Sequence, residues 1–208
     1  MFFIQIRLRA TKEADMIILA SGSPRRREIL SDLGAEFTVI TADVDESCDE
    51  KDPERLAASL AMRKGLAVYE KLNLDGSPFV SCPIISADTV VFCDGEIMGK
   101  PKNASDAKRM LKKLSGRAHS VSTGICVISN GQPFCDSVTT KVFVDSLSDA
   151  EIDAYISTGD PFDKAGSYGI QGIFSKHINK IEGCYFNVVG LPVNSLSHLF
   201  KKATGERI

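Results

Sequence analysis

An apolar segment with one carboxylate in its middle constrains this chain more than any other feature. Residues 83–92 read Pro-Ile-Ile-Ser-Ala-Asp-Thr-Val-Val-Phe, which is the pattern of a strand buried on both faces. Such a strand needs covering layers on both sides of its sheet. Asp88 lies at its centre, and a buried carboxylate is costly unless it is ion-paired, binds a metal or faces a cleft. The segment therefore predicts a central strand that carries a functional or paired acid.

The rest of the chain alternates short strands with helices. Residues 17–20 and 37–40 are short apolar strands, and Asn130-Gly131 is a strong hairpin signal between two further strands. Apolar residues at helical spacing predict helices over residues 25–33, 53–72 and 105–114, after Ser148, and over residues 192–201. This mixture predicts an α/β fold with a mixed sheet and flanking helices, and it leaves the topology open.

Composition indicates a globular protein with enough length for a core. The 208 residues are 43% hydrophobic and 25% charged, so no disulfide or structural metal is needed for stability. The formal net charge of -2 argues against a protein that coats nucleic acid through a general positive field. The six cysteines are dispersed, which favours free thiols in a reducing cytosol and predicts a cytoplasmic protein.

Residues 1–15 are interpreted as an N-terminal appendage to a domain over residues 16–208. Their apolar residues alternate with polar and basic ones, as in an extra edge strand or a weak organelle-targeting arm. The apolar part is too short to span a membrane, so no membrane partner is expected. Met16 directly precedes the first strong strand.

Residues 21–26 join the first strand to the first helix and predict an anion site. Ser23 suits the N-cap and Pro24 the first helical position, where unpaired N–H groups and a partial positive charge face outward. Arg25 and Arg26 oppose that charge, so two arginines there call for an anionic partner. Their forked donors match phosphate oxygens. The alternative is a pair of arginines on a solvated first turn.

Acidic residues elsewhere suggest a divalent cation. Asp45 and Glu46 offer the hard oxygen ligands that Mg²⁺ and Mn²⁺ prefer, although a loop acid is usually only solvated. For Asp88, structural pairing is the alternative to a role as base or metal ligand. The three histidines lie in no ligand spacing, so a zinc site is not expected.

Two lysines and a glycine-rich stretch could complete a pocket for a phosphorylated ligand. Lys64 falls on the apolar stripe of its helix, and Lys100 lies between a glycine and a proline. A lysine on such a stripe more often lays its aliphatic part over apolar surface. A binding role for the two lysines is therefore expected only if they lie in the same pocket as the arginines. Residues 163–172 suit the reading of a base edge through Gln171, or form a flexible surface loop. Neither a Walker-type nor a dinucleotide-binding glycine motif occurs.

Six segments in order resemble the Maf family of nucleotide pyrophosphatases, from Met16 nearly to the C-terminus. One segment alone would be weak, but six in the family's order are highly specific. They are ASGSPRR at 20–26, DVDE at 43–46, SADTVV at 86–91, GKP at 99–101, residues 163–172, and NVVGLP at 187–192.

The resemblance implies a two-lobed α/β fold, related to the inosine-triphosphate pyrophosphatases, with its site in a central cleft. It implies hydrolysis of a nucleoside triphosphate to the monophosphate and pyrophosphate, a house-cleaning role against non-standard nucleotides. A divalent cation, Mg²⁺, Mn²⁺ or Co²⁺, is the implied cofactor, and a homodimer the implied assembly. Arg26, Thr89 and Gln171 match the subgroup that acts on dTTP and UTP rather than on 7-methyl-GTP.

The same resemblance places Asp88 at the position of the family's proton acceptor. We expect Asp88, with help from Glu46, to hold the cation and to activate a water toward the α-phosphorus. The triphosphate and the departing pyrophosphate are expected to meet N–H groups after Ser21 and four cationic side chains, those of Arg25, Arg26, Lys64 and Lys100.

Two other functions stay open at this point. One is a broader pyrophosphatase that removes modified pyrimidine or purine nucleotides. The other is a nucleotide-sensing interaction protein that restrains cell division and uses the pocket only to bind. Asp88 argues against the sensor, because tight binding of a polyanion does not call for an extra carboxylate beside it.

Overall fold

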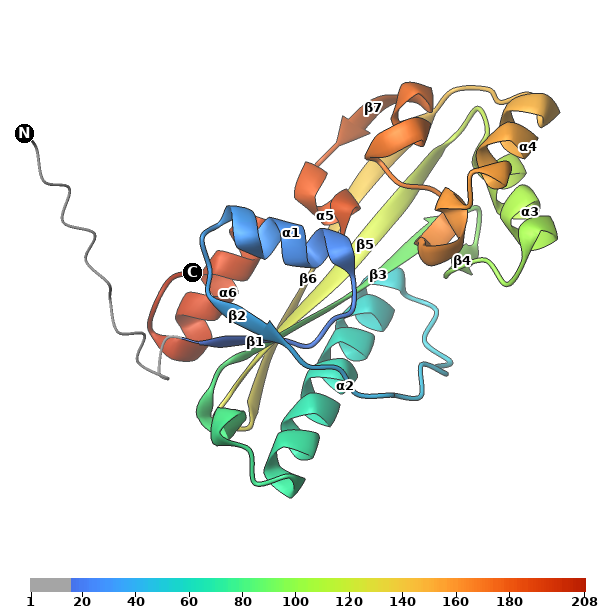
Figure 1. The fold of residues 1–208 in the computed structure, drawn as a ribbon. Coiled ribbons are helices and arrows are strands. Elements are labelled where there is room, and N and C mark those ends of the chain that lie inside the picture. Colours follow the sequence, from blue (N-terminus) through green and yellow to red (C-terminus); the bar gives the residue numbers. More distant parts are fainter. Residues whose placement is uncertain (1–15) are drawn as a thin grey trace, which may run out of the picture.

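The structure, a computed structural model, describes residues 16–208, so the appendage predicted over residues 1–15 lies outside the described residues. A mixed seven-stranded sheet forms its centre, with helices on both faces, which confirms the predicted α/β class (Figure 1). The strand order is β2-β1-β3-β5-β6-β7, and β4 also pairs with β3.

The strands are β1 (Ile17–Leu19), β2 (Phe37–Val39), β3 (Ile84–Cys93), β4 (Glu96–Met98), β5 (Ala118–Ser129), β6 (Gln132–Val144) and β7 (Ile178–Glu182). The α-helices are α1 (Pro24–Asp32), α2 (Pro53–Leu74), α3 (Ala104–Leu114), α4 (Asp149–Ser157), α5 (Tyr185–Val189) and α6 (Val193–Thr204). Short 3₁₀ helices are η2 (Pro78–Ser81), η3 (Asp160–Asp163), η4 (Ala165–Ser167) and η5 (Gly172–His177).

Strand β3 has one fully paired edge and one edge with a gap. Along the first edge, β5 pairs with β3 from residue 84 to residue 92. The second edge is shared: β1 pairs with Ile84 and Ile85, and β4 pairs with residues 91–93. Residues 86–90, with Asp88 at their centre, therefore lie on a stretch of strand edge between two neighbouring strands.

The two faces of β3 and β5 bury different helices because side chains alternate along a strand. Ile85 and Ala87 belong to the core that contains α1 and α6. Ile84, one residue earlier, belongs to the core beneath α2. The predicted burial of this strand on both faces is confirmed.

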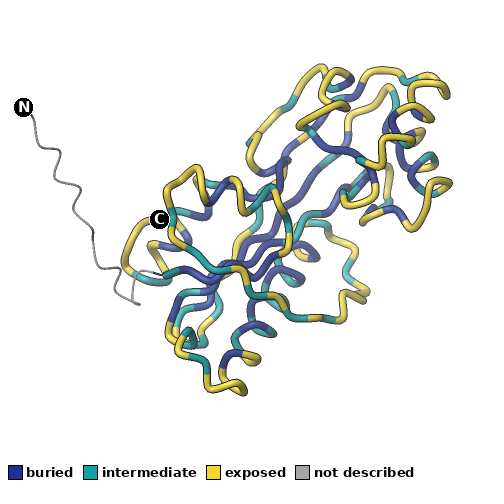
Figure 2. Tube along the Cα trace, in the orientation of Figure 1, coloured by how far each residue is buried: buried dark blue, intermediate teal, exposed yellow. Residues whose placement is uncertain are grey.

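The long strands β3, β5 and β6 extend through two lobes (Figure 1). One lobe contains β1, β2, α1, α6 and most of α2. In the other, α3, α4, Tyr168 and Phe174 enclose a separate apolar cluster. Figure 2 shows buried backbone running along the strands from one lobe into the other. The expected two-lobed shape is thus built on one continuous sheet.

Helix α2 approaches the sheet closely at two glycines. A Cβ on Gly124 of β5 would lie 2.2 Å from the carbonyl carbon of Ala57 in α2. A Cβ on Gly65 of α2 would lie 2.8 Å from the Oγ of Ser86, which itself donates to the Ala61 carbonyl at 2.6 Å. The helix can pass this near to β3 only because these positions carry no side chain.

Some local predictions were correct and others were wrong. The predicted hairpin turn is formed by Asn130 and Gly131 with φ of 50° and 76°, and the predicted helix over residues 53–72 is α2, which Asp52 caps by accepting from the N–H groups of Glu54 and Arg55. The short elements β4 and α5 were missed, because three and five residues are too few to show a clear periodicity. Ser23 does precede α1, but its side chain makes no capping hydrogen bond.

Gly124→Ala should lower the free energy of unfolding by about 3 kcal/mol, because the new methyl group meets helix backbone that cannot move aside locally. Urea denaturation of the purified variant measures this loss. Gly99→Ala is the control, since a Cβ there meets no atom within 4 Å. Its free energy should change by less than about 0.5 kcal/mol. Equal stability of the two variants would contradict the close approach of α2.

Candidate active site

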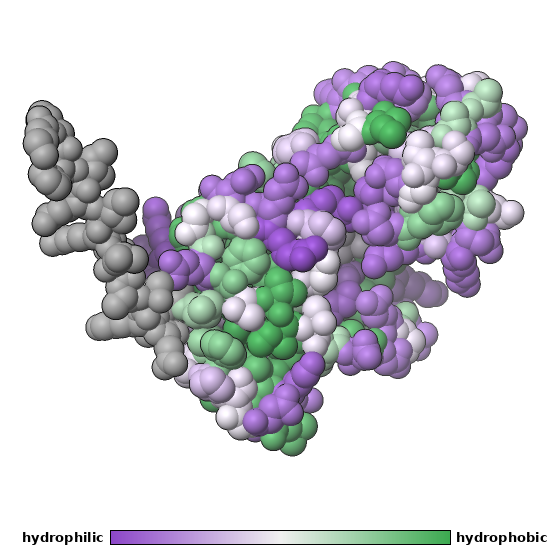
Figure 3. Space-filling view, viewed as in Figure 1, coloured by the Kyte–Doolittle hydropathy of each residue, from purple (hydrophilic) through white to green (hydrophobic). Residues whose placement is uncertain are grey.

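The gap in the edge of β3 opens into a cavity of about 830 Å³ between the two lobes. Its size suits a ligand as large as a nucleotide. Nine of the side chains considered for the site line this one cavity, and Asp45 does not: the nine are Ser21, Arg25, Arg26, Glu46, Lys64, Asp88, Thr89, Lys100 and Gln171. Figure 3 shows hydrophilic side chains gathered around the start of α1, in the middle of the molecule. The structure therefore brings together residues that span most of the sequence.

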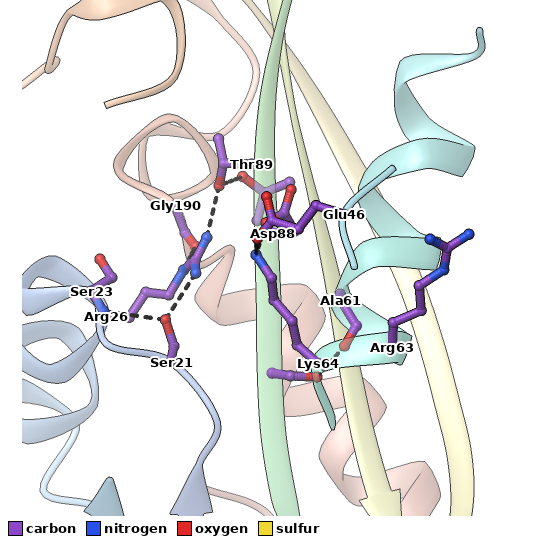
Figure 4. A network of polar contacts seen from close by, with 12 residues as sticks. Ser21, Ser23, Arg26, Glu46, Ala61, Arg63, Lys64, Asp88, Thr89 and Gly190 are labelled. Carbon is purple, nitrogen blue, oxygen red and sulfur yellow. Dashed lines mark hydrogen bonds and ion pairs between the residues drawn. The ribbon is translucent and has the colours of Figure 1, made fainter. Parts of the chain in front are cut away.

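Asp88 faces α2, where it forms an ion pair with Lys64. The Lys64 Nζ lies 2.5 Å from Asp88 Oδ1 and 2.7 Å from Glu46 Oε1 (Figure 4). The side chain of Asp88 is only 13% exposed, whereas that of Glu46 is 60% exposed. Burial by itself would lower the pKa of Lys64, but the two carboxylates raise it above its usual value. Lys64 is therefore a positively charged partner that compensates the partly buried Asp88 carboxylate.

Thr89, the next residue of β3, points to the opposite face and contacts Arg26 of α1. The Arg26 guanidinium donates from Nη2 to Thr89 Oγ1 at 3.1 Å and from Nη1 to Ser21 Oγ at 2.9 Å. Its Nε donates to the Gly190 carbonyl at 2.8 Å (Figure 4). One side chain thus joins the loop after β1, the centre of β3 and the loop before α6.

This network continues across the neighbouring strands β5 and β6. Thr89 Oγ1 lies 2.9 Å from Thr123 Oγ1, and the backbone N–H of Thr123 donates to Asn187 Oδ1 at 3.1 Å. The Asn187 side chain is fully buried and also donates to the Val121 carbonyl and to Thr140. Burial lowers the pKa of Arg26, while the charge of Asp88 opposes that shift. Arg26 therefore connects three segments of the chain by hydrogen bonds, in addition to the phosphate binding expected from its position in the sequence.

Arg25 extends across the cavity to Asp163, which was not predicted as a site residue. Its Nη1 lies 3.0 Å from Asp163 Oδ2, and Asp163 also pairs with Lys164 at 2.6 Å. Lys164 lines the cavity with only 12% of its side chain exposed, and it pairs further with Asp160. The only signal in the sequence was an acid next to a base at the start of the glycine-rich stretch.

Lys100 and Gln171 are exposed parts of the cavity lining, on two neighbouring loops. The loops meet where the backbone N–H of Gly166 donates to the Gly99 carbonyl at 3.0 Å. Gly166 has φ of 67° and packs against Val91, so a side chain there would clash. This contact holds the glycine-rich stretch beside β3 and explains why Gln171 shares a cavity with Lys100.

Two acids of the cavity could serve as ligands of a divalent cation. Asp88 and Glu46 converge on one point, now taken by the Lys64 ammonium. Within residues 16–208 no cluster of three or more histidine, cysteine or acidic residues is arranged as a metal site. Two carboxylates are nevertheless enough for Mg²⁺, which takes its other ligands from water and substrate phosphates. Asp45 is used differently, because its carboxylate accepts the N–H and hydroxyl of Ser47.

A buried histidine contacts a tyrosine that lines the cavity. His119 of β5 is 3% exposed, and its Nε2 lies 2.6 Å from the hydroxyl of Tyr168, a lining residue. Nδ1 of His119 is buried without a hydrogen-bond partner among the described residues. Burial lowers the pKa of His119 to about 4. This histidine is therefore neutral near pH 7 and positions Tyr168.

Fold and site together define an α/β protein with a cleft that combines basic side chains and a paired acid. Such a cleft is expected of a protein that binds a polyanionic small molecule. The sequence profile of the family described as Maf-like protein matches residues 16–203. The chain belongs to the Maf family.

Several curated relatives cover almost the whole domain. The dTTP/UTP pyrophosphatase of Thermococcus kodakarensis is 48% identical over 178 residues, which is 86% of this chain and 92% of the relative. That of Caldicellulosiruptor saccharolyticus is 44% identical over 189 residues, covering 89% and 94%. Among solved structures, the Staphylococcus aureus Ham1 protein aligns with a TM-score of 0.44 and 14% identity over 92% and 90% of the two chains. No helix within residues 16–208 has the length and apolarity to cross a membrane.

Stability should fall between pH 6.5 and pH 4 because of His119. The unfolded histidine gains a proton near pH 6.5, whereas the folded one does so only near pH 4. The free energy of unfolding should therefore drop by up to about 3 kcal/mol as pH falls through this interval. Urea titrations at several pH values measure the slope.

His119→Asn removes the titrating group, so the slope in this interval should become shallower even if the variant is less stable overall. His198→Asn, at an exposed histidine of α6, is the control and should keep the wild-type slope. Identical slopes for wild type and His119→Asn would contradict a neutral, buried His119.

Proposed function

We propose that this protein hydrolyses dTTP and UTP to the nucleoside monophosphate and pyrophosphate. The observation that carries the proposal is the placement of Asp88, an acid at the gap in β3 that is paired with Lys64, inside a nucleotide-sized cavity lined by basic side chains. The names of the curated relatives support the reaction and the pyrimidine substrates. A protein that only sensed nucleotides would bind a polyanion without needing a carboxylate beside it.

In the proposed mechanism Asp88 accepts a proton from the water that attacks the α-phosphorus. Lys64 fixes the orientation of the carboxylate from the α2 side through the contact of 2.5 Å between Lys64 Nζ and Asp88 Oδ1. A carboxylate that is oriented by a hydrogen-bonded partner and lines the cavity can accept a proton from a bound water within hydrogen-bond reach. The bond to the pyrophosphate leaving group breaks as the water oxygen bonds to phosphorus.

Other cationic groups of the cavity would bind the phosphates. We assign this role to Arg25, Lys100 and the N–H groups that follow Ser21, because all of them line the cavity. Lys164 is added to the set expected from the sequence. Lys64 contributes less charge to the phosphates than expected, since Asp88 and Glu46 already balance it. Groups placed where negative charge develops on the leaving group lower the barrier directly.

Asp88 and Glu46 are the residues that would hold a divalent cation, Mg²⁺, Mn²⁺ or Co²⁺. Their convergence on a single point supports this assignment. A bound cation would neutralise phosphate charge and make phosphorus easier to attack.

Arg26, Thr89 and Gln171 are proposed to set the preference for a pyrimidine base. The hydrogen bond between Arg26 and Thr89 supports this, because it makes two of the three positions one rigid unit. Gln171 would read polar atoms of the base with its exposed amide. We further propose a cytoplasmic location and a homodimer, on the basis of the family resemblance.

Asp88→Asn should reduce the rate of pyrophosphate release by at least about 100-fold, because the amide cannot accept the proton. Release from dTTP with Mg²⁺ measures this, and the melting temperature reports whether the fold survives. Asp94→Asn is the matched control, since Asp94 lies in the turn after β3 and pairs with Arg117 outside the cavity. Near-normal turnover by Asp88→Asn would exclude Asp88 as the base.

A panel of dTTP, UTP, CTP, ITP and 7-methyl-GTP should give the highest kcat/KM for dTTP and UTP. Pyrophosphate and the nucleoside monophosphate should appear in equal amounts. High activity on modified or purine nucleotides would instead indicate the broader sanitising enzyme. If no triphosphate released pyrophosphate with Mg²⁺ or Mn²⁺, the nucleotide sensor would be the correct function.

A further inference from the structure

Two cysteines of the β5–β6 hairpin face each other outside the active-site cavity. Cys126 of β5 is paired directly with Cys135 of β6, and their sulfur atoms are in contact at 2.6 Å. Both are free thiols, and neither lines the cavity around Asp88. We propose that Cys126 and Cys135 form a reversible dithiol–disulfide site that is oxidised by hydrogen peroxide.

The register of the hairpin provides the geometry for a disulfide. In an antiparallel ladder, hydrogen-bonded and non-hydrogen-bonded pairs alternate, and the latter bring Cα atoms to about 4.5 Å. Ile128 pairs with Pro133, which has no N–H to donate, so this is a non-hydrogen-bonded pair. Cys126 and Cys135 lie two residues further along both strands and belong to the same type. A Cα separation of that size lies within the range of about 4.4–6.8 Å found in disulfides.

The two thiols differ in access. Cys135 is exposed, whereas Cys126 has no exposed surface and packs with Ala61 and Val68 beneath α2. The hydrogen bond shared by the two sulfur atoms lowers the pKa of Cys135, and the same bond together with burial raises that of Cys126. Cys135 is therefore the thiol that reacts first, and Cys126 is the one that resolves the product.

The chemistry needs only peroxide as co-reactant. The Cys135 thiolate attacks one peroxide oxygen, the O–O bond breaks, and the departing hydroxide leaves as water once protonated, which gives a sulfenic acid. The sulfur of Cys126 then attacks the sulfenic sulfur, the S–O bond breaks, and a second water leaves with the Cys126 proton. Two thiols are oxidised to one disulfide while one peroxide is reduced to two waters.

The surface around Cys135 favours a small neutral oxidant. It forms a shallow hollow together with the start of α2, and three carboxylates against one guanidinium line it: Asp52, Glu54, Asp136 and Arg55. This excess of negative charge disfavours anionic disulfides such as oxidised glutathione. Peroxide carries no charge and should react faster.

The test is peroxide treatment of the full chain, followed by denaturation, thiol titration and peptide mapping. Two of the six thiols should disappear together, with a crosslinked peptide pair joining Cys126 to Cys135. Dithiothreitol should restore both thiols. Oxidised glutathione at equal concentration should react more slowly.

Variants separate the two roles. Cys135→Ser should keep Cys126 reduced, while Cys126→Ala should stop at a sulfenic acid on Cys135 that dimedone traps. Cys48→Ser removes an exposed cysteine elsewhere and should leave the crosslink unchanged. A wild-type protein that keeps both thiols under peroxide, or that forms its crosslink between other cysteines, would overturn the proposal. Dimedone capture of Cys135 in the wild type with Cys126 still reduced would do the same.

Discussion

The ionised carboxylate of Asp88 lies on a strand that is covered on both faces, and the rest of the site follows from the need to compensate it. Lys64 supplies the compensation from α2, at 2.5 Å. A single ammonium can do so only if its helix passes close to the sheet. Gly124, the direct partner of Asp88 in the β3–β5 ladder, leaves the space for that approach. The ion pair between Lys64 and Asp88 therefore depends on the close packing of α2 against the sheet at Gly124.

Because side chains alternate along β3, neighbouring residues of this strand have different roles on its two faces. Asp88 faces α2 and an acidic loop, while Thr89 faces α1 and its arginine. Two successive residues thus connect two separate sets of partners, one suited to proton transfer and a cation, the other to a rigid wall of the cavity. A one-residue shift in the register of β3 would exchange both sets and destroy the site.

Much of this could be predicted because the informative residues carry strong local signals. An acid inside an apolar strand, two arginines at a helix start and a hairpin dipeptide each have a physical meaning without any partner. The family segments added the grouping of these residues into one site. The spatial partners could not be predicted in the same way. That Lys64 meets Asp88, that Arg26 is held by the Gly190 carbonyl, or that Arg25 reaches Asp163 depends on loops and helix packing that no local pattern encodes.

The two lobes are joined by continuous strands, since β3, β5 and β6 cross from one to the other. Enzymes that close by a hinge usually rotate two bodies about a few flexible connecting residues. A rotation of this kind would have to bend the hydrogen-bonded ladders that join β3, β5 and β6. The width of the cleft is therefore tied to the twist of the central sheet.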